Sequence, residues 1–275
     1  MKYRYKTAVR NLIFYASLLM TVFVVGFPLY WMLVTSFTPA DMVFDTPPNI
    51  IPTKFSLQNY VQLFEGTVFP EYLKNSLMVV VGVVGVTTLF SSLAGYTLKR
   101  YDFPQKKNVA RLVLFSYMFP GMLRAIPLFI TFKSIGLLDT YWGLILAQTS
   151  EALPFGIWLM WLFFQTIPNR FEECARTLGA GRFRSIFQVA MRMALPGVIA
   201  TAIFSFAVSW GDYIYVKCLT ANFRTIPLGL GMFMEQAYIH WGLIQAGSTI
   251  AFIPPIILVI FLQKYILAGF SLRGV

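Results

Sequence analysis

Residues 173–197 read ECARTLGAGRFRSIFQVAMRMALPG, a polar and basic stretch between long apolar runs. The preceding Pro168 and Asn169 are typical of the start of a helix, whereas Gly179 and Gly181 are typical of its end. The stretch is therefore predicted to begin as a short helix and to continue as a turn. A polar loop between apolar runs of this length points to a chain that crosses a membrane several times.

The charges of this short helix suit its position. Glu172 and Glu173 fall in the first turn, where carboxylates complement the helix dipole. Glu172 is also spaced i to i+4 from Arg176, which predicts an ion pair along the helix. One side of the segment is almost without side chains, because it carries Ala175, Gly179 and Ala180. A surface that bare allows another protein to approach the backbone closely.

The composition confirms the membrane interpretation. The chain has 275 residues, of which 57% are hydrophobic and 12% charged, and its mean hydropathy is +0.68. Soluble domains do not have such values. The formal net charge is +11, but the basic residues lie between apolar runs and not along one polar face, which indicates topology and argues against a nucleic-acid partner. We therefore predict an all-α integral membrane protein.

Six apolar runs are predicted to be transmembrane helices, each near or above the roughly 20 residues that a span requires. They cover residues 11–37, 76–98, 110–132, 141–164, 191–215 and 246–267. Most of the 22 Lys and Arg residues fall on the segments that this model places inside, which predicts cytoplasmic N- and C-termini. The expected parts are a cytoplasmic N-terminus with the first span (1–37), an extracytoplasmic loop with one short helix near 57–64 (38–74), a core of five spans (75–268) with the loop 168–190, and a cytoplasmic tail (269–275).

The third apolar run contains helix-breaking residues. Pro120, Gly121 and Pro127 interrupt residues 110–132 and predict a kinked span. The backbone carbonyls that a kink frees must face protein or a water-filled path instead of lipid.

Three ionisable residues are predicted at membrane depth: Arg124, Glu151 and Asp212. An unpaired charge there costs at least about 2.5 kcal/mol, so such residues are candidates for a substrate path, and Arg124 is placed to pair with Glu151. Aromatic rings can also stack on the ring of a passing solute, which makes candidates of Tyr117, Trp158, Trp161, Trp210 and Tyr213, with Trp210 and Tyr213 assigned to the path. Two alternatives remain open: the charges hold helices together or snorkel, and the aromatic residues pack or mark the membrane interface.

No catalytic or cofactor-binding pattern is present in the sequence. It has no phosphate-binding Gly-Lys motif, no Ser/His/Asp set and no spaced Cys/His ligands, and its single His240 is predicted to lie in a loop. Cys174 and Cys218 fall on opposite sides of the membrane in the six-span model and cannot form one disulfide. We therefore expect a chain that is not an enzyme, binds no cofactor or metal, and depends on other subunits for any ATP hydrolysis.

The spacing of Glu173, Ala175 and Gly179 resembles the EAA loop of type I ABC importer permeases. Cys174 stands where that motif has its first Ala, and Met191–Arg192 stands where relatives usually have Leu-Pro before the next span. In that family the loop forms a coupling helix that seats in a cleft of a cytoplasmic ATPase and carries its motion into the membrane. The resemblance implies that the ATPase contacts are Glu172, Glu173, Ala175, Arg176, Gly179 and Ala180.

Further motifs, nearly from end to end, resemble the maltose-type permeases of carbohydrate uptake family 1. They include Pro28-Leu29-Tyr30-Trp31, Ala94-Gly95-Tyr96, Ile126-Pro127-Leu128, Trp210-Gly211-Asp212 and Gly269-Phe270-Ser271-Leu272. The resemblance implies import of a di- or oligosaccharide across a bacterial cytoplasmic membrane by alternating access. It implies as partners a second, usually different permease, two ATPases that bind ATP and Mg²⁺, and an extracytoplasmic binding protein. The contact loop for that protein is expected at Thr225, Pro227 and Gly229.

The residues also allow two other classes of membrane protein to be considered as alternatives. A stand-alone secondary transporter would use Arg124 and Glu151 for ion coupling, but the sequence has no internal repeat. A membrane-embedded enzyme would need paired polar groups at one depth, and no such set is visible. Arg124 gives a weak indication of an acidic sugar, and the sequence does not choose between a uronate oligomer and a neutral disaccharide.

Overall fold

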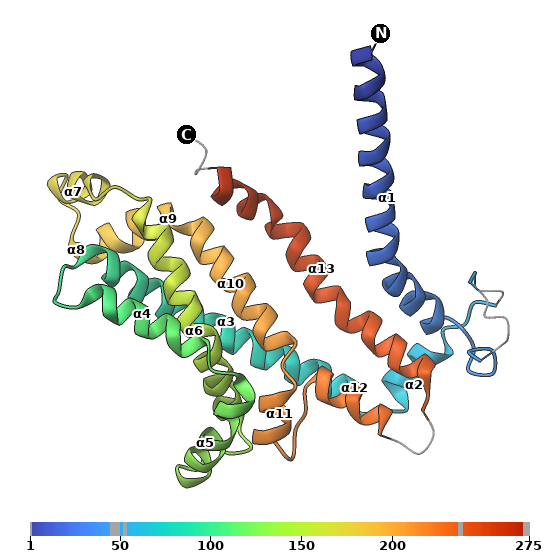
Figure 1. Cartoon of the computed structure of the whole chain (residues 1–275). Helices are drawn as coiled ribbons and strands as arrows, with labels where there is room; N and C mark the ends of the chain where they lie inside the picture. Colours follow the sequence, from blue (N-terminus) through green and yellow to red (C-terminus); the bar gives the residue numbers. More distant parts are fainter. Residues whose placement is uncertain (1, 45–49, 52–53, 236–238, 272–275) are drawn as a thin grey trace. The chain divides into compact units, whose positions relative to one another are not determined.

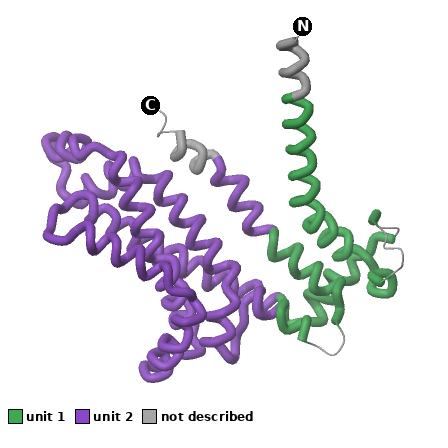
Figure 2. The backbone as a smooth tube through the Cα atoms, viewed as in Figure 1, with its two compact units in different colours: residues 1–69, 230–252 green, residues 70–229, 253–275 purple. Residues whose placement is uncertain are grey.

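The computed structural model describes residues 2–44, 50–51, 54–235 and 239–271, and every regular element in these ranges is helical (Figure 1). The predicted all-α class is therefore confirmed. The chain divides into two compact units: residues 1–69 with 230–252, and residues 70–229 with 253–275 (Figure 2). Each unit is described by itself below.

In the first unit a buried polar residue joins two helices. Asn59 is 4% exposed, and its Nδ2 donates to the carbonyl oxygens of Ser36 (3.0 Å) and Thr38 (2.9 Å). The hydroxyl groups of Ser36 and Tyr60 are 2.8 Å apart. These contacts hold the short predicted helix of the outer loop against the end of the first helix. The helices of this unit are α1 (Lys2–Ser36), α2 (Gln58–Glu65), the end of α12 (Ile226–Met234) and the start of α13 (Trp241–Ser271).

The second unit is packed through apolar and small side chains. Its core includes Val79, Val83, Leu144 and Tyr215, all nearly inaccessible to solvent. Its elements are α3 (Phe69–Arg100), α4 (Lys106–Tyr117), α5 (Gly121–Ser134), α6 (Tyr141–Gln165), α7 (Arg170–Thr177), α8 (Arg182–Arg184), the π-helix Ser185–Ala190, α9 (Met191–Met193), α10 (Leu195–Trp210) and α11 (Ile214–Leu219).

Glycines bring α3, α6 and α10 close together. A Cβ added at Gly95 on α3 would lie 2.6 Å from the Cβ of Met160 on α6, and one added at Gly156 would collide with Ser91 on α3 and approach Thr201 on α10. Small residues at such contacts allow membrane helices to pack by close van der Waals approach, which replaces the hydrophobic effect as the driving force inside a bilayer.

Two of the expected spans are sharply bent. The run 110–132 is not one kinked helix, because α4 and α5 meet at 94°. Pro120 precedes α5 with an extended backbone (ψ 137°), so the α4 helix cannot continue through it. The run 191–215 is also divided: α8 to α9 and α10 form a bent pair with an angle of 72°, α10 ends at Trp210, and the separate helix α11 follows.

Other helix boundaries differ moderately from the apolar runs. Helix α6 coincides with the predicted 141–164 almost to the residue, whereas α3 begins at Phe69, inside the expected outer loop. Helix α13 starts at Trp241 and continues to Ser271, so it includes the first residues of the expected tail 269–275. Residues 272–275 lie outside the described residues.

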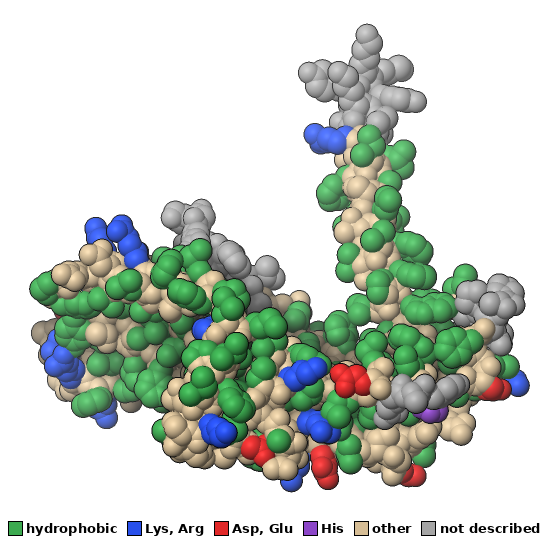
Figure 3. Space-filling model, turned by 60° about the horizontal axis from the view of Figure 1, so that its bottom comes forward, with side chains coloured by type: hydrophobic (Ala, Val, Ile, Leu, Met, Phe, Trp, Pro, Cys, Tyr) green, Lys and Arg blue, Asp and Glu red, His purple; other side chains and the backbone are tan. Residues whose placement is uncertain are grey.

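Three of the described helical segments are long and apolar enough to cross a membrane: Arg10–Ser36, Phe69–Arg100 and Trp241–Gln263. The number rises to five if each bent pair is one span. Helix α6 corresponds to the fourth expected span, the one expected span not included in these five, and the polar run Gln148–Glu151 in its middle lowers its hydropathy. The six-span topology therefore stays a prediction. Hydrophobic side chains nevertheless cover much of the visible surface of each unit (Figure 3), as expected beside lipid or partner helices.

Candidate functional site

The first half of the loop 168–190 is the short helix and turn that the sequence predicts, whereas residues 182–190 are helical and not a loop. Helix α7 covers Arg170–Thr177 and is preceded by Asn169. The helix is closed by Gly179, whose φ of +90° is a left-handed conformation that glycine adopts without strain. The amide of Ala180 donates to the carbonyl oxygen of Ala175 at 3.0 Å, which satisfies one of the last helical carbonyls.

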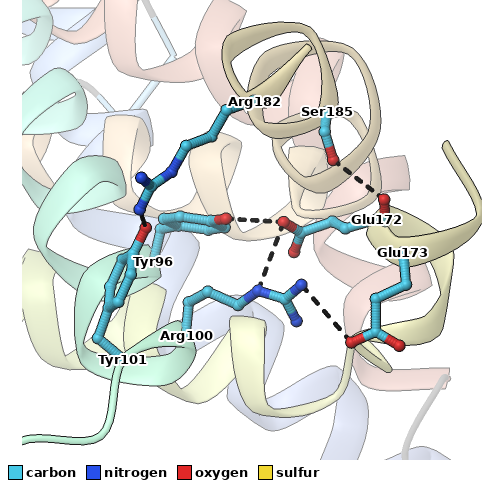
Figure 4. A network of polar contacts seen from close by, with 7 residues as sticks. All are labelled: Tyr96, Arg100, Tyr101, Glu172, Glu173, Arg182 and Ser185. Carbon is cyan, nitrogen blue, oxygen red and sulfur yellow. Dashed lines mark hydrogen bonds and ion pairs between the residues drawn. The ribbon is translucent and has the colours of Figure 1, made fainter. Parts of the chain in front are cut away.

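Glu172 is buried, and it is bound to α3 instead of to its own helix (Figure 4). The hydroxyl of Tyr96 donates to Oε2 of Glu172 at 2.7 Å, and Nε of Arg100 lies 3.7 Å from the same oxygen. The expected ion pair of Glu172 with Arg176 is wrong: among the described residues the exposed Arg176 forms no ion pair, and Glu172 is bound to the two donors on α3 instead.

The network extends to both sides of Glu172 (Figure 4). Oε1 of Glu173 lies 3.7 Å from a terminal nitrogen of Arg100, although 63% of the Glu173 side chain is exposed. The hydroxyl of Ser185 donates to the backbone carbonyl of Glu172 at 3.4 Å. The guanidinium of Arg182 donates to the Tyr101 hydroxyl and lies 5.4 Å from that ring. One arginine of α3 thus bridges both acids of α7.

Sequence reasoning missed the partners that hold the loop: Tyr96, Arg100, Tyr101, Arg182 and Ser185. A signal was present, because Tyr96 and Arg100 are spaced i to i+4 at the end of an apolar run and therefore share one face of α3. Which acid they meet depends on how α7 packs against α3, and no local pattern in the sequence specifies that packing.

The exposed face of the loop, called its outer face below, is open and apolar. Leu178 is 90% exposed and Phe183 is 79% exposed. A Cβ added at Gly179 or Gly181 would have no neighbour within 4 Å. Large apolar side chains that project from a polar loop, next to backbone that is bare, are typical of a site that another protein covers.

The predicted ion pair of Arg124 with Glu151 is present. A terminal nitrogen of Arg124 on α5 lies 3.5 Å from Oε1 of Glu151 on α6, and both side chains remain partly exposed. Arg124 also donates to the carbonyl oxygen of Ser150 at 3.3 Å. The pair joins the two helices on either side of the outer turn, and each charge is compensated by the other.

Asp212 belongs to a second polar group, which sequence reasoning did not find. Its Oδ2 accepts a hydrogen bond from Nε2 of Gln148 at 2.8 Å, and its Oδ1 accepts one from the amide of Tyr215 at 3.3 Å. Oε1 of Gln148 accepts in turn from the hydroxyl of Ser209 at 2.6 Å. Gln148 and Glu151 are three residues apart on α6 and so share one face of it.

The aromatic candidates make other contacts. The ring of Trp210 stacks on Phe206, one turn earlier on α10, with ring centres 5.4 Å apart. The hydroxyl of Tyr213 accepts from Nζ of Lys217 at 3.1 Å. These contacts position the two rings but do not assign them a role along a substrate path.

The expected binding-protein loop is largely packed inside the second unit. Thr225 is 4% exposed, and a Cβ added at Gly229 would overlap the ring of Tyr72. Pro227 alone of the three predicted contact residues keeps part of its side chain accessible. The exposed part of this loop is Ala221–Asn222 instead.

Asp139 links that exposed loop to the turn between α5 and α6. Its Oδ1 accepts hydrogen bonds from the amides of Ala221 (2.7 Å) and Asn222 (3.0 Å), and its Oδ2 accepts from the Asn222 side chain. Burial raises the pKa of this carboxyl, but the three hydrogen bonds lower it by more, so the pKa of Asp139 lies below its usual value.

The cysteines and the histidine lie apart from these groups. Cys174 on α7 and Cys218 on α11 are both exposed and free. His240 directly precedes α13 in the first unit, where it contributes to the wall of a small hollow beside Asn59. Within the described residues, no three His, Cys, Asp or Glu side chains are grouped as a metal site would require.

The helical fold and the loop site define a class of transport proteins. A family model described as "Binding-protein-dependent transport system inner membrane component" matches residues 87–271, and the chain belongs to this family. Similar proteins include the inner membrane ABC transporter permease protein YcjP of Escherichia coli K12, 31% identical over 266 residues and covered to 95% in both chains. The trehalose/maltose transport system permease protein MalG of Thermococcus litoralis is 29% identical over 267 residues, also with 95% of each chain covered.

A solved structure has the same fold. It is a chain of a bacterial ABC transporter involved in the import of the acidic polysaccharide alginate, with a TM-score of 0.81, 21% identity, and coverage of 95% of this chain and 98% of that one. The family confirms the ABC importer permease fold and a multi-pass membrane protein. It also confirms that the chain is a transport subunit and not an enzyme. The stand-alone secondary transporter is therefore set aside.

Proposed function

We propose that this chain is a permease subunit of an ATP-driven importer that moves a di- or oligosaccharide across the cytoplasmic membrane by alternating access. The sugar class is supported by the relatives, which include trehalose/maltose and diacetylchitobiose permeases. Its partners would be a second homologous permease, two ATPases that carry ATP and Mg²⁺, and an extracytoplasmic binding protein. The excess of basic residues on the loop side favours cytoplasmic termini.

The observation that carries the proposal is the two-sided construction of α7. Its inner side is fixed to α3 through Glu172, and the segment that follows it presents Leu178, Phe183 and bare glycine backbone on the exposed side of the loop. An ATPase that binds the outer side therefore acts on α3 through a buried, charge-assisted contact.

Helix α3 is suited to carry such a displacement. It has 32 residues, which at a rise of about 1.5 Å per residue is roughly 48 Å of continuous helix. A rigid helix transmits a change between distant sites only if the protein has two arrangements and the ligands at both sites shift the equilibrium between them. ATP must accordingly bind the outward-open arrangement better than the inward-open one.

The proposed substrate path includes Arg124 and Glu151, with Gln148 and Asp212 on the neighbouring polar group. Because Glu151 compensates Arg124, the weak indication of an acidic sugar loses its basis. The carboxylates of Glu151 and Asp212 remain partly accessible, and carboxylates are good partners for sugar hydroxyl groups. We therefore favour a neutral sugar.

The coupling role is tested by Gly179→Asp, with Gly136→Asp as its matched control. Both glycines have positive φ (90° and 73°), and neither would have a neighbour within 4 Å of an added Cβ, so the backbone strain of the two variants is comparable. Gly179→Asp places a charge on the bare outer face of the loop. We expect it to insert normally but to lose most of the co-purifying ATPase and to abolish uptake, whereas Gly136→Asp retains both.

The measurement is affinity purification of the tagged chain from its native membrane, followed by identification of bound subunits and by uptake assays with labelled maltose and trehalose. Normal ATPase recovery and uptake in Gly179→Asp would exclude α7 as the coupling helix. Loss of uptake in both variants would show that strain, and not docking, is responsible.

A further inference from the structure

A groove between α4 and α6 is used by none of the sites described above. It has a volume of about 200 Å³, several times the roughly 30 Å³ that a water molecule occupies in the liquid. Helices α4 and α6 lie side by side in the second unit (Figure 1). The groove is lined by Lys107, Ala110, Arg111, Leu114, Trp158 and Trp161.

The lining is almost wholly apolar, and the carbon stems of two basic residues form part of it opposite two tryptophans. Lys107 and Arg111 are spaced i to i+4 on α4 and share one face, with Cβ atoms about 6 Å apart. Trp158 and Trp161 are spaced i to i+3 on α6 and face the same space. Between them, Ala110 is 4% exposed and forms an apolar floor.

The two cations of the groove are not neutralised within the described chain. The neighbouring Lys106 is bound to Asp102 at 3.0 Å, and Arg100 is bound to Glu172. For Lys107 and Arg111 no carboxylate of the described residues lies within ion-pair distance, and the groove lining contains no acid. Two uncompensated positive charges are therefore carried by exposed residues whose stems line an apolar groove.

The groove lies near one end of each of its two helices. Lys107 and Arg111 lie in the first two turns of α4, which begins at Lys106. Trp161 lies about one turn before the end of α6 at Gln165. Both helix ends lie on the side of the unit that carries α7 (Figure 1), and because tryptophans are enriched at membrane–water interfaces, we place the groove at the level where headgroups meet acyl chains.

We propose that this groove binds the headgroup phosphate of an anionic phospholipid in the leaflet on the side of α7. Lys107 and Arg111 hold the phosphate, while the rings of Trp158 and Trp161 and the Leu114 side chain contact the glycerol and the first acyl methylenes. A free phosphate ion would leave this apolar half of the groove without a partner. Basic pockets between membrane helices recognise acidic lipids in this way. In the topology proposed above, this is the cytoplasmic leaflet.

The test uses tryptophan quenching by brominated lipid. The tagged chain, with whatever subunits accompany it, is placed in nanodiscs of phosphatidylcholine that contain a minor fraction of either dibrominated phosphatidylglycerol or dibrominated phosphatidylcholine. Because the chain has six tryptophans, the groove component is defined as the quenching lost in Trp158→Phe/Trp161→Phe. We expect this component to be strong with brominated phosphatidylglycerol and weak with brominated phosphatidylcholine.

The decisive variant is Lys107→Gln/Arg111→Gln. Each basic residue near an anionic surface contributes roughly fivefold to binding, so the apparent preference for phosphatidylglycerol should fall by about 25-fold. The matched control, Lys99→Gln/Arg192→Gln, removes two charges from the same side of the unit but outside the groove, and it should keep the preference. Neither control residue belongs to the loop network or to the proposed path.

Four outcomes would overturn the proposal. Equal quenching by the two brominated lipids would mean that the groove holds bulk lipid, and no groove component at all would mean that another subunit covers it. Relief of the quenching by inorganic phosphate would identify a small-anion site. Relief by glucuronate would place the groove on a path for acidic sugars. The quenching assay does not depend on ATPase docking or on uptake, so its failure would leave the proposed transport function intact.

Discussion

At the scale of single residues, two adjacent acids have opposite environments. Glu172 is buried on the inner side of α7 and accepts a hydrogen bond from Tyr96. Glu173 is mostly exposed, and the one partner that it has in common with Glu172 is Arg100. A buried carboxylate is tolerated only where donors replace its water. The acid that aligns with the EAA motif is therefore not the one that anchors the loop.

This anchoring predicts the effect of Tyr96→Phe. The variant removes the hydroxyl that donates to Glu172 and leaves the ring in place, and hydrogen bonds to charged groups contribute about 1.5–3 kcal/mol. We expect a lower thermal unfolding temperature of the purified protein and weaker stimulation of the partner ATPase by binding protein. Tyr101→Phe is the control, since its hydroxyl is partnered only at an exposed site, and it should change neither quantity measurably. Equal effects of the two variants would mean that the Glu172 contact does not hold α7.

At the scale of elements, breaks in helices place polar groups where continuous helices would not. The 94° bend between α4 and α5 directs Arg124 toward α6, where Glu151 receives it at 3.5 Å. The polar run in the middle of α6 supplies Glu151 to one group and Gln148 to the other. Helix α6 is thus the element around which the proposed substrate path is arranged.

The ion pair between α5 and α6 can be divided by substitution into structural and transport roles. Arg124→Gln alone leaves Glu151 uncompensated and Glu151→Gln alone leaves Arg124 uncompensated, and removing one partner of a largely desolvated pair is strongly destabilising. The double variant Arg124→Gln/Glu151→Gln carries no unpaired charge, and we expect it to reach the membrane at normal levels.

Uptake then distinguishes the two roles of the pair. If these side chains contact the sugar, the double variant is abundant in the membrane but transports at a small fraction of the normal rate. Full uptake by the double variant would show that the pair only holds α5 to α6. Quantitative immunoblotting of membranes and initial rates of labelled disaccharide uptake provide the two readouts.

The link between the α5–α6 turn and the loop after α11 predicts a pH dependence. The pKa of Asp139 is lower in the folded chain than its ordinary value of 3.8, so the carboxylate stabilises the link above that value and the stabilisation is lost as pH falls through the lowered pKa. Amide exchange at Ala221 and Asn222 should therefore be slower in the wild type than in Asp139→Asn at neutral pH, and the difference should vanish in strong acid. A difference that did not depend on pH would contradict the assignment to ionised Asp139.

At the scale of the whole molecule, the chain has surfaces that it does not cover by itself. Apolar residues along α1, from Leu12 to Val25, are largely exposed, with values such as 69% for Leu12 and 64% for Val25. The outer face of α7 is exposed as well. These surfaces are consistent with a subunit that is surrounded by lipid and works within a larger assembly, which is the family's way of functioning.

The sequence by itself determined the fold class, the short helix that is closed by Gly179, and the Arg124–Glu151 pair. These features follow from hydropathy, from helix signals and from the helical rise, which are all local or one-dimensional. Only the tertiary structure decided that Glu172 binds Tyr96 and Arg100 instead of Arg176, that Gln148 binds Asp212, and that the basic face of α4 meets the tryptophans of α6. Each of these contacts joins segments far apart in the chain, and the direction of a side chain toward another helix depends on bends and close glycine contacts that no local pattern specifies.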